Sequence, residues 1–235
     1  MINRAHFVAI GNFNPAIFQP NWFSRHSIVP EEEIERLLSE PFRREIPEIK
    51  AIIEFGQYFL VEPNQALINF KSMSLRVSRD KLEAICEDRA KFPFMIEFLR
   101  KVFKMLPETP VAAYGINFNE NAIFEKDIKE ISQNLFSVNE DVSTLFGLDC
   151  TYGHSIKAKR GEITILFRVV QSDLDNNASL FAFNWQRVNS SPDSRFIVDK
   201  VGEDLEEGLK FAEEVMEKYC GKIITRISTA KKKGS

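Results

Sequence analysis

The residues from which catalytic and metal-binding motifs are usually built are few and scattered in this sequence. His6, His26 and His154 lie far apart, and none stands in an H-x-x-x-H or H-E-x-x-H frame. The chain has no C-x-x-C, G-x-S-x-G or G-x-G-x-x-G motif and no P-loop. The sequence therefore predicts no metal site, no cofactor and no catalytic residue, and it favours a protein that is not an enzyme.

Cys150 and His154 come closest to a catalytic pair. They are four residues apart in a predicted strand, so both side chains point to one face of that strand. They form either a Cys–His dyad or a buried thiol beside a hydrogen-bonded histidine. The acidic run Glu31–Glu33 follows Pro30, and there we expect carboxylates at the positive end of a helix dipole rather than a metal site.

A doubled polar motif offers a second kind of chemistry. Residues 9–18 read AIGNFNPAIF and residues 113–124 read AYGINFNENAIF, so both contain a glycine, then Asn-Phe-Asn, then Ala-Ile-Phe. The four asparagines are Asn12, Asn14, Asn117 and Asn119. Amides donate and accept hydrogen bonds, so these side chains could bind a ligand, a peptide backbone or base edges. Alternatively, they close the turns at the ends of two strands.

The predicted strand Leu180–Val188 offers a candidate surface. A period of two places Phe181, Phe183 and Trp185 on one side of it. Either the closing helix buries these rings, or they form an exposed aromatic patch for a partner or ligand. Three arginines also lie on predicted strands and could gather on one sheet face to contact phosphates: Arg76, Arg168 and Arg187.

The doubled motif begins a longer repeat, which sets the architecture. Each copy predicts a strand, a helix, four further strands and a closing helix. In the first copy these are strand 5–13, a helix from Pro30 to Pro41, strands 49–55, 66–70, 75–78 and 82–86, and helix 93–106. In the second they are strand 111–118, helix 126–136, strands 149–158, 163–170, 180–188 and 196–198, and helix 204–219, with Asp204 as its N-cap and Gly221 as its stop.

We therefore expect an α+β fold made by tandem duplication of a β-α-β-β-β-β-α unit. The repeats span 1–107 and 108–227 and join about a pseudo-twofold axis, and a disordered tail follows at 228–235.

This element order resembles the TATA-binding-protein fold, a duplicated saddle in which the first strand of each half supplies an asparagine to the centre. The resemblance implies a curved, mostly antiparallel sheet with helices on one face. It places Asn12, Asn14, Asn117 and Asn119 near the centre of that sheet. The family is strongly basic, whereas this chain is mildly acidic, which argues against DNA binding.

Three short stretches carry a second resemblance: Gly115-Ile116-Asn117, the strand Leu180–Arg187 and the terminal Ile223-Ile224-Thr225. In these stretches the chain is similar to a sporadically distributed group of uncharacterised bacterial proteins of similar length. The resemblance implies a bacterial origin and an accessory role, such as antiviral defence or toxin control.

Composition narrows the remaining function classes. The chain of 235 residues has 31 Lys and Arg against 34 Asp and Glu, a net charge of -3 that disfavours general nucleic-acid binding. Its 44% hydrophobic content excludes a disordered chain, and its 21 phenylalanines should dominate the core. Three scattered cysteines, no signal-peptide pattern and no bilayer-length apolar window predict a cytoplasmic protein without membrane contact.

The expected function is therefore binding, and the expected partner is another protein or a second copy of this chain. Two alternatives stay open. One is a nucleic-acid-binding saddle, and the other is a small-molecule binding protein or enzyme with a pocket between sheet and helices.

Overall fold

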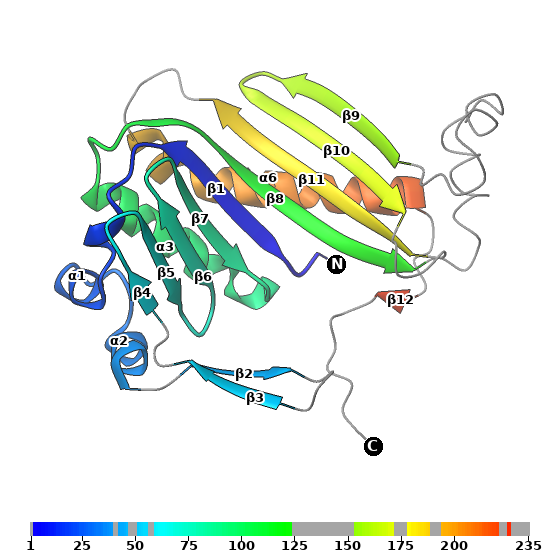
Figure 1. Ribbon diagram of the computed structural model, residues 1–235. Helices are drawn as coiled ribbons and strands as arrows, with labels where there is room; N and C mark the ends of the chain where they lie inside the picture. The colour runs from blue at the N-terminus through cyan, green and yellow to red at the C-terminus, as the bar shows by residue number, and fades with distance from the viewer. Residues whose placement is uncertain are drawn as a thin grey trace. The chain divides into compact units, whose positions relative to one another are not determined.

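The computed structural model divides the chain into two compact units, each described here by itself (Figure 1). Unit 1 comprises Met1–Ile2, Asn117–Gln186 and Glu206–Ser235, and unit 2 comprises Asn3–Ile116 and Arg187–Leu205. The structure describes residues 2–39, 42–46, 51–55, 59–123, 153–171, 178–188, 194–220 and 225–226. Both units combine helices with a mostly antiparallel sheet, which confirms the expected α+β class.

The described residues of unit 2 form a sheet, the helices α1, α2 and α3, and a separate hairpin. Along the chain its elements are β1 (Ala5–Gly11), α1 (Pro20–Arg25), α2 (Glu31–Ser39), β2 (Phe42–Ile46), β3 (Ala51–Phe55), β4 (Phe59–Val61), β5 (Gln65–Asn69), β6 (Ser74–Ser78), β7 (Lys81–Cys86), α3 (Phe92–Met105) and the first part of β8 (Val111–Ile123). The strand order is β4-β5-β6-β7-β1-β8, while β2 and β3 pair only with each other among the described strands. The first helical turns of α6 (Arg195–Cys220) also belong to this unit.

Unit 1 contains the second part of β8, β9 (Gly153–Arg160), β10 (Ile163–Gln171), β11 (Ala178–Val188) and α6 from Glu206 onward. The strand order is β8-β11-β10-β9, and the short β12 (Thr225–Arg226) pairs with β8. In Figure 1 this part of α6 lies across one face of the sheet, over β8 and β11. Among the described residues, α6 therefore covers one face of this sheet.

Local sequence explains the connections between neighbouring strands. Gly161 lies in the turn between β9 and β10 with a φ of +60°, a left-handed conformation that favours glycine. In the turn between β6 and β7, the Ser78 hydroxyl donates to Asp80 Oδ1 at 2.7 Å. This hydrogen bond lowers the pKa of the exposed Asp80 carboxyl. Both turns follow the expected preference for glycine and short polar residues.

Most predicted strands and helices of unit 2 are confirmed. The first strand, the helix after Pro30, the three strands before the closing helix and the closing helix itself all occur within a few residues of the expected bounds. The structure adds β2, β4 and α1, which the sequence pattern did not indicate. The expected helix 126–136 and the stop at Gly221 lie outside the described residues.

Two expectations about the closing helix of the second copy are wrong. Residues 196–198 form the first turn of α6 and not a strand, and Asp204 lies inside this helix and is not its N-cap. The β-branched and aromatic residues at this position suggested a strand. Burial instead follows the helical period, because Ile197, Val201 and Leu205 are all buried at intervals of four residues.

The core is rich in phenylalanine, as expected. Phe23, Phe70 and Phe98 pack against one another in unit 2, with ring centroids 5.4 to 5.9 Å apart. On the two long helices Phe98, Val102, Leu209, Ala212 and Met216 are buried as well. None of the helices in the described part of the chain is both long and apolar enough to cross a membrane.

The two glycines inside α6 have different surroundings, and we expect opposite effects when each is replaced by alanine. A Cβ at Gly208 would lie 2.9 Å from the Phe118 ring and 3.1 Å from the Trp185 ring, both buried. We expect Gly208→Ala to destabilise the fold by about 1 kcal/mol. Overpacking costs about 1–3 kcal/mol, and the higher helix propensity of alanine offsets up to about 1 kcal/mol of that cost.

Gly202→Ala is the matched comparison. Its Cβ would lie 2.6 Å from Nη2 of Arg100, the far end of a long side chain that can move away. Here we expect a gain of up to about 1 kcal/mol from helix propensity. Urea unfolding of both variants measures the difference, and equal effects at the two positions would show that the helix does not approach β8 and β11 as closely as described.

Candidate functional site

The sheet of unit 1 has two chemically different faces. Side chains alternate along each strand, and on β8, β10 and β11 those of the helix-covered face are buried and mostly apolar, including Phe118, Phe167 and Phe183, with Glu120 as a buried acidic residue among them. The opposite side we call the open face. Its residues with described side chains are Asn117 and Asn119 on β8, Leu180, Ala182, Asn184 and Gln186 on β11, Thr164, Leu166 and Arg168 on β10, and Ser155, Lys157 and Lys159 on β9. All of these residues are half-buried or exposed.

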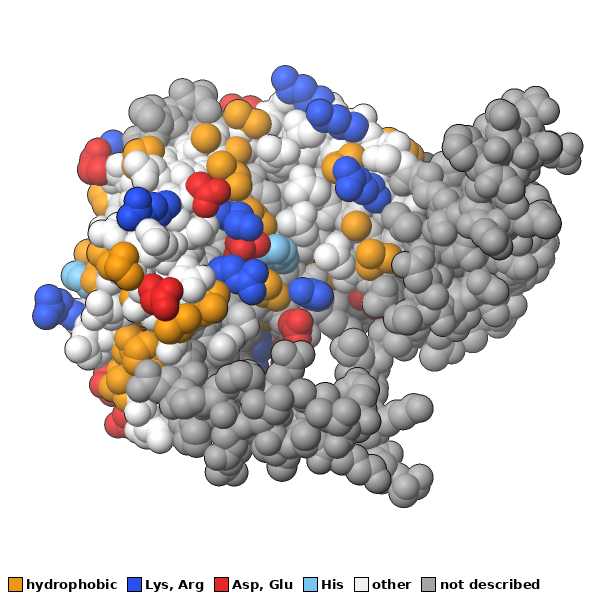
Figure 2. All heavy atoms as spheres, in the orientation of Figure 1, with side chains coloured by type: hydrophobic (Ala, Val, Ile, Leu, Met, Phe, Trp, Pro, Cys, Tyr) orange, Lys and Arg blue, Asp and Glu red, His pale blue; other side chains and the backbone are white. Residues whose placement is uncertain are grey.

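Register confirms that the cations share this face. In the antiparallel pair β9–β10, Lys159 lies opposite Thr164 and Lys157 lies opposite Leu166. Directly opposed residues in an antiparallel pair point to the same side of the sheet. Lys157, Lys159 and Arg168 are all exposed, and Figure 2 shows Lys and Arg side chains over β9 and β10.

Among the described residues of unit 1, most exposed carboxylates stand on the helix instead. The exposed carboxylates of α6 in this unit are Glu206, Glu207, Glu214 and Glu217. The open face as defined above carries three cations and no carboxylate, although Glu162 stands in the turn beyond it. Within the part of unit 1 that the structure describes, the open face is therefore basic although the chain has a net charge of -3.

Amides occupy the two strands next to the cations. Asn184 Nδ2 donates to Asn117 Oδ1 at 2.7 Å, which joins β11 to β8 through their side chains. Asn119 and Gln186 stand on the same face, each two residues further along its strand. Because an amide both donates and accepts, this part of the face can match a ligand with alternating donors and acceptors.

The four asparagines of the doubled motif have different roles. Asn14 Oδ1 accepts a hydrogen bond from the Ala16 backbone N–H at 3.2 Å, which closes the turn after β1. Asn12 is exposed, and its backbone N–H donates to the Pro110 carbonyl at 2.9 Å. Both lie in unit 2, whereas Asn117 and Asn119 lie in β8 within unit 1. Their joint role as a binding site stays a prediction.

The aromatic side chains of β11 are core residues. Phe181, Phe183 and Trp185 are at most 3% exposed. The Phe183 ring stacks on Phe167 with centroids 4.7 Å apart, and Trp185 packs on Phe211 of α6. The closing helix therefore buries these rings, and they do not form the exposed aromatic patch that was the alternative.

The predicted arginines also separate. Arg168 lies on the open face of unit 1, while Arg76 is exposed on β6 of unit 2. Arg187 instead points toward α6 and pairs with a buried carboxylate. Sequence reasoning missed Lys157, Lys159 and Asn184. Their signal was available, because each alternates with residues of the opposite face in its strand.

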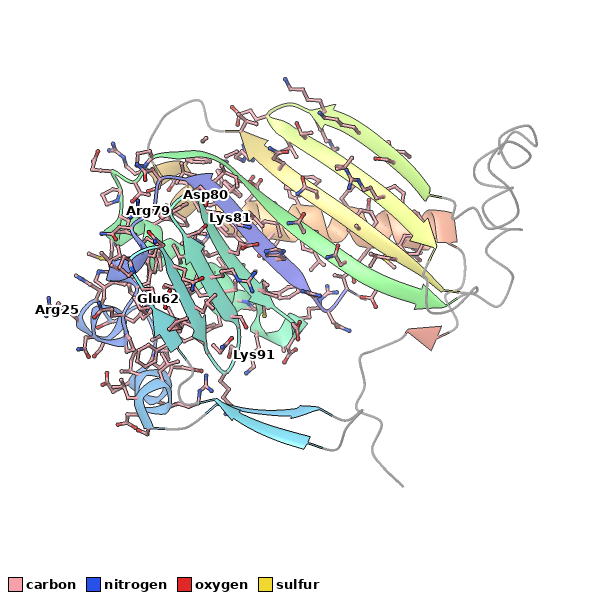
Figure 3. The ribbon with its side chains drawn as sticks, viewed as in Figure 1. Arg25, Glu62, Arg79, Asp80, Lys81 and Lys91 are labelled. Atoms are coloured by element: carbon pink, nitrogen blue, oxygen red, sulfur yellow. The ribbon has the colours of Figure 1, made fainter. Side chains whose placement is uncertain are left out.

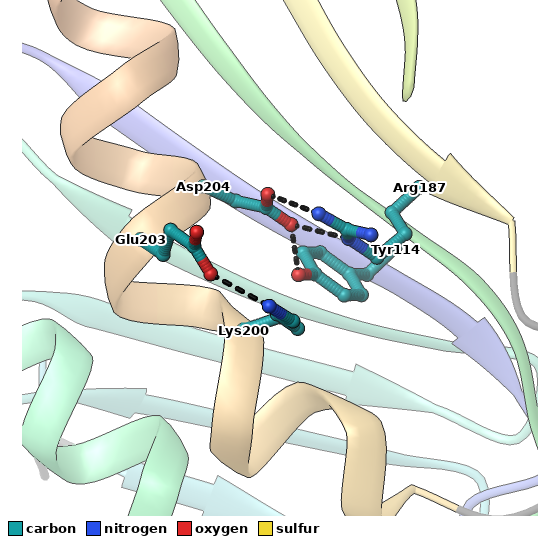
Figure 4. Close-up of polar contacts among 5 residues, drawn as sticks. All are labelled: Tyr114, Arg187, Lys200, Glu203 and Asp204. Carbon is teal, nitrogen blue, oxygen red and sulfur yellow. Dashed lines mark hydrogen bonds and ion pairs between the residues drawn. The ribbon is translucent and has the colours of Figure 1, made fainter. Parts of the chain in front are cut away.

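Arg187 belongs to a buried polar cluster in unit 2 (Figure 4). Its Nε and Nη2 donate to the two Asp204 carboxylate oxygens at 2.8 and 2.7 Å, and the Tyr114 hydroxyl donates to the same carboxylate. Asp204 is completely buried. Burial, reinforced by the bond to Asp204, raises the pKa of Tyr114, and the bond to Asp204 raises the pKa of Arg187. The cluster ties α6 to β8 and is a structural interaction.

A second polar cluster lies on the sheet of unit 2, near the turn that Figure 3 marks with Asp80 and Lys81. His6 Nε2 lies 3.1 Å from Glu83 Oε1, and Lys81 Nζ lies 3.0 Å from Glu83 Oε2. Burial lowers the pKa of His6 despite the raising effect of Glu83. The imidazole is therefore a hydrogen-bonding partner of Glu83, and Lys81 supplies the counter-charge of that carboxylate.

The remaining chemical candidates give no further site. Burial raises the pKa of the Cys86 thiol, which makes it a poor nucleophile. Cys150, the first half of the suggested dyad, lies outside the described residues. Within the ranges that the structure describes, no three His, Cys, Asp or Glu side chains are grouped to hold a metal ion. No family model matches this chain, and no curated protein matches its sequence.

Removing the charge of Asp204 should destabilise unit 2 strongly. Asp204→Asn removes the carboxylate charge that accepts from both Nε and Nη2 of Arg187, and breaking such a largely buried pair costs about 3–5 kcal/mol. The neighbouring Glu203→Gln is the control, because its ion pair with Lys200 is half exposed and contributes at most about 1 kcal/mol. Urea unfolding compares the two, and a similar small loss for both would contradict the structural role of the cluster.

Tyr114 should make the fold sensitive to alkaline pH. Its pKa is higher in the folded state than in the unfolded chain, where it is about 10. Above that pH the unfolded chain loses the proton first, so stability falls by up to about 1.4 kcal/mol per pH unit. We expect Tyr114→Phe to remove this contribution to the fall of the free energy of unfolding with pH, between about pH 9.5 and about pH 11. Unchanged slopes in urea unfolding would contradict the buried hydroxyl.

Proposed function

We propose that this protein is a non-enzymatic binding protein and that the open face of unit 1 binds nucleic acid. One observation carries the proposal: three exposed cations and four amides share a face that holds no carboxylate among its defined residues, while the carboxylates lie on α6. Phosphates are bound by clustered Lys and Arg, and amides contact sugar and base edges without adding charge.

The acidic composition does not oppose this proposal. Interactions between exposed charges are screened beyond about 8–10 Å at moderate salt. The ligand therefore responds mainly to Lys157, Lys159 and Arg168 on the open face, and only weakly to the glutamates of the helix on the other side of the sheet. Three phosphate contacts imply modest affinity and a salt slope of about -2.7 for B-form DNA.

We propose further that the fold is a duplicated saddle. Supporting it, the two strand orders match from the first strand outward: β1 is followed by β7, β6 and β5, and β8 is followed by β11, β10 and β9. In each case the first strand lies next to the last strand before a long helix. From the sequence resemblance of three short stretches to sporadic bacterial proteins, we further propose an accessory role, with antiviral defence or toxin control as its setting.

A protein partner is the second candidate function. A groove of about 400 Å³ lies beside the edge strand β4 of unit 2 and is lined by Gln19, Pro20, Asn21, Leu38, Phe59, Leu60 and Val61. Leu38 and Leu60 are 56% and 43% exposed. Exposed leucines beside an edge strand favour contact with another chain.

A salt-titrated binding assay tests the nucleic-acid proposal. We expect the wild-type protein to bind DNA or RNA at about 50 mM salt, with the logarithm of affinity falling linearly with the logarithm of salt. The double variant Lys157→Gln, Lys159→Gln should reduce the magnitude of that slope for duplex DNA by about 1.8. Both side chains are exposed, so its melting temperature should match wild type.

Lys210→Gln is the matched control, because Lys210 is exposed on α6 within the same unit. It removes one positive charge from the helix, against two from the open face in the double variant, and should leave affinity and slope unchanged. No binding by wild type at about 50 mM salt, or an equal loss in the control, would end the proposal.

A further inference from the structure

We propose that the outer edge of β9 binds an extended acidic segment of a partner protein, which adds to the sheet of unit 1 as a further antiparallel strand. This inference goes beyond the proposed function, because it concerns the edge of the sheet and the backbone of β9 rather than the open face. The surface consists of residues 155–160, all of which are exposed.

The first argument is that β9 offers an unpaired backbone edge. It is the last strand in the order β8-β11-β10-β9, so no described strand pairs with its outer side (Figure 1). Its 8 residues make it longer than β4, the outer strand of unit 2, which has 3. A long free edge of this kind is a template for pairing with another chain.

The direction of the free backbone groups follows from the turn. Gly161 and Glu162 form the two-residue turn of the β9–β10 hairpin. Backbone groups of an antiparallel strand alternate in direction along the chain. Counting back from the turn, the N–H and C=O groups of Ser155, Lys157 and Lys159 face the outer edge. These three residues are therefore the ones that an added strand contacts through its backbone.

The second argument is an apolar surface that reaches β9 and is uncovered there. Ile156 lies opposite Phe167 and Ala158 lies opposite Ile165, so both belong to the helix-covered side of the sheet. Phe167 and Ile165 are buried, whereas Ile156 is 53% exposed and Ala158 is exposed as well. An added strand with apolar residues on this side would remove Ile156 and Ala158 from water.

The third argument is charge, which decides the occupant. Lys157 and Lys159 project from the other side of β9, and the residues directly opposite them on β10 are the uncharged Leu166 and Thr164. Opposite charges on neighbouring strands stabilise a sheet, and like charges destabilise it. A second copy of this chain would bring its own lysines beside these two. The strand that fits therefore carries Asp or Glu at alternate positions, with apolar residues between them.

Fluorescence anisotropy with the full-length protein and no nucleic acid tests the inference. The probe is a labelled peptide of about the length of β9 in which Glu alternates with Val. The first control contains Lys in place of Glu, and the second has the same composition with Glu and Val in separate blocks. We expect the alternating acidic peptide to bind about 10-fold more tightly than either control. Equal binding by either control overturns the inference.

Two methylated peptides separate strand addition from simple charge attraction. In an antiparallel pair, the residues opposite Lys157 and Lys159 turn their N–H groups toward β9, and these are the Glu positions. N-methylation at Glu should therefore weaken binding about 10-fold, whereas N-methylation at Val leaves the paired edge intact. Equal affinity of the two methylated peptides would show charge attraction alone and overturn the inference.

Two variants at one position give a second readout. Lys157→Gln removes the charge and keeps the backbone N–H, whereas Lys157→Pro removes both. Proline is tolerated in an edge strand where its nitrogen faces away from the sheet. We expect Lys157→Gln to weaken peptide binding up to about 5-fold, and Lys157→Pro about 10-fold further. Equal affinity of the two variants, with melting curves that show both folded, contradicts the backbone contact. Dimers of the wild-type protein that Lys157→Pro abolishes would identify a second copy as the occupant instead.

Hydrogen exchange of the wild-type protein needs no variant. A saturating amount of the alternating acidic peptide should slow exchange of the amides of residues 155–160 and leave those of α6 unchanged. Unchanged exchange in β9 overturns the inference. None of these measurements involves nucleic acid, so their failure leaves the proposed function to its own assay.

Discussion

The burial of one sheet face beneath a helix is the constraint on which the rest of unit 1 depends. Strand side chains alternate between two faces, so committing the large rings to one face leaves the other to the residues between them. In β11 the buried Phe181, Phe183 and Trp185 leave Ala182, Asn184 and Gln186 outward. The same alternation in β10 leaves Arg168 outward. Packing therefore dictates where the polar surface lies, and local sequence decides that this surface is basic and rich in amides.

The position of α6 depends on a few close contacts in each unit. In unit 1 Gly208 allows the helix backbone to approach the Phe118 and Trp185 rings, where any side chain would collide. In unit 2 the buried Asp204 carboxylate accepts from both Tyr114 and Arg187. A buried carboxylate is tolerated only when charge and hydrogen bonds compensate its desolvation, so this cluster specifies where along the helix the contact is made.

Periodic patterns in the sequence predicted much of the fold but little of the site. Helix α3 and the strands before it could be predicted from the sequence, because each has one strongly apolar side. The start of α6 was not, because Phe196–Val198 has the composition of a strand and becomes helical through the burial of Ile197 and Val201. Asn14 and Asn117 belong to matching motifs, yet one closes a turn and the other pairs with Asn184. Pairings between distant strands decide such roles, and a linear pattern does not contain them.

Lysine footprinting tests the central claim most directly, because it reports which face of unit 1 the ligand covers. The protein is acetylated with and without a saturating nucleic-acid duplex, and the modified lysines are quantified by mass spectrometry. Lys157 and Lys159 on the open face and Lys210 on α6 are all exposed in the free protein, so they start from comparable accessibility. We expect the duplex to protect Lys157 and Lys159 and to leave Lys210 reactive. Protection of Lys210 with unchanged reactivity at Lys157 and Lys159 would contradict the account.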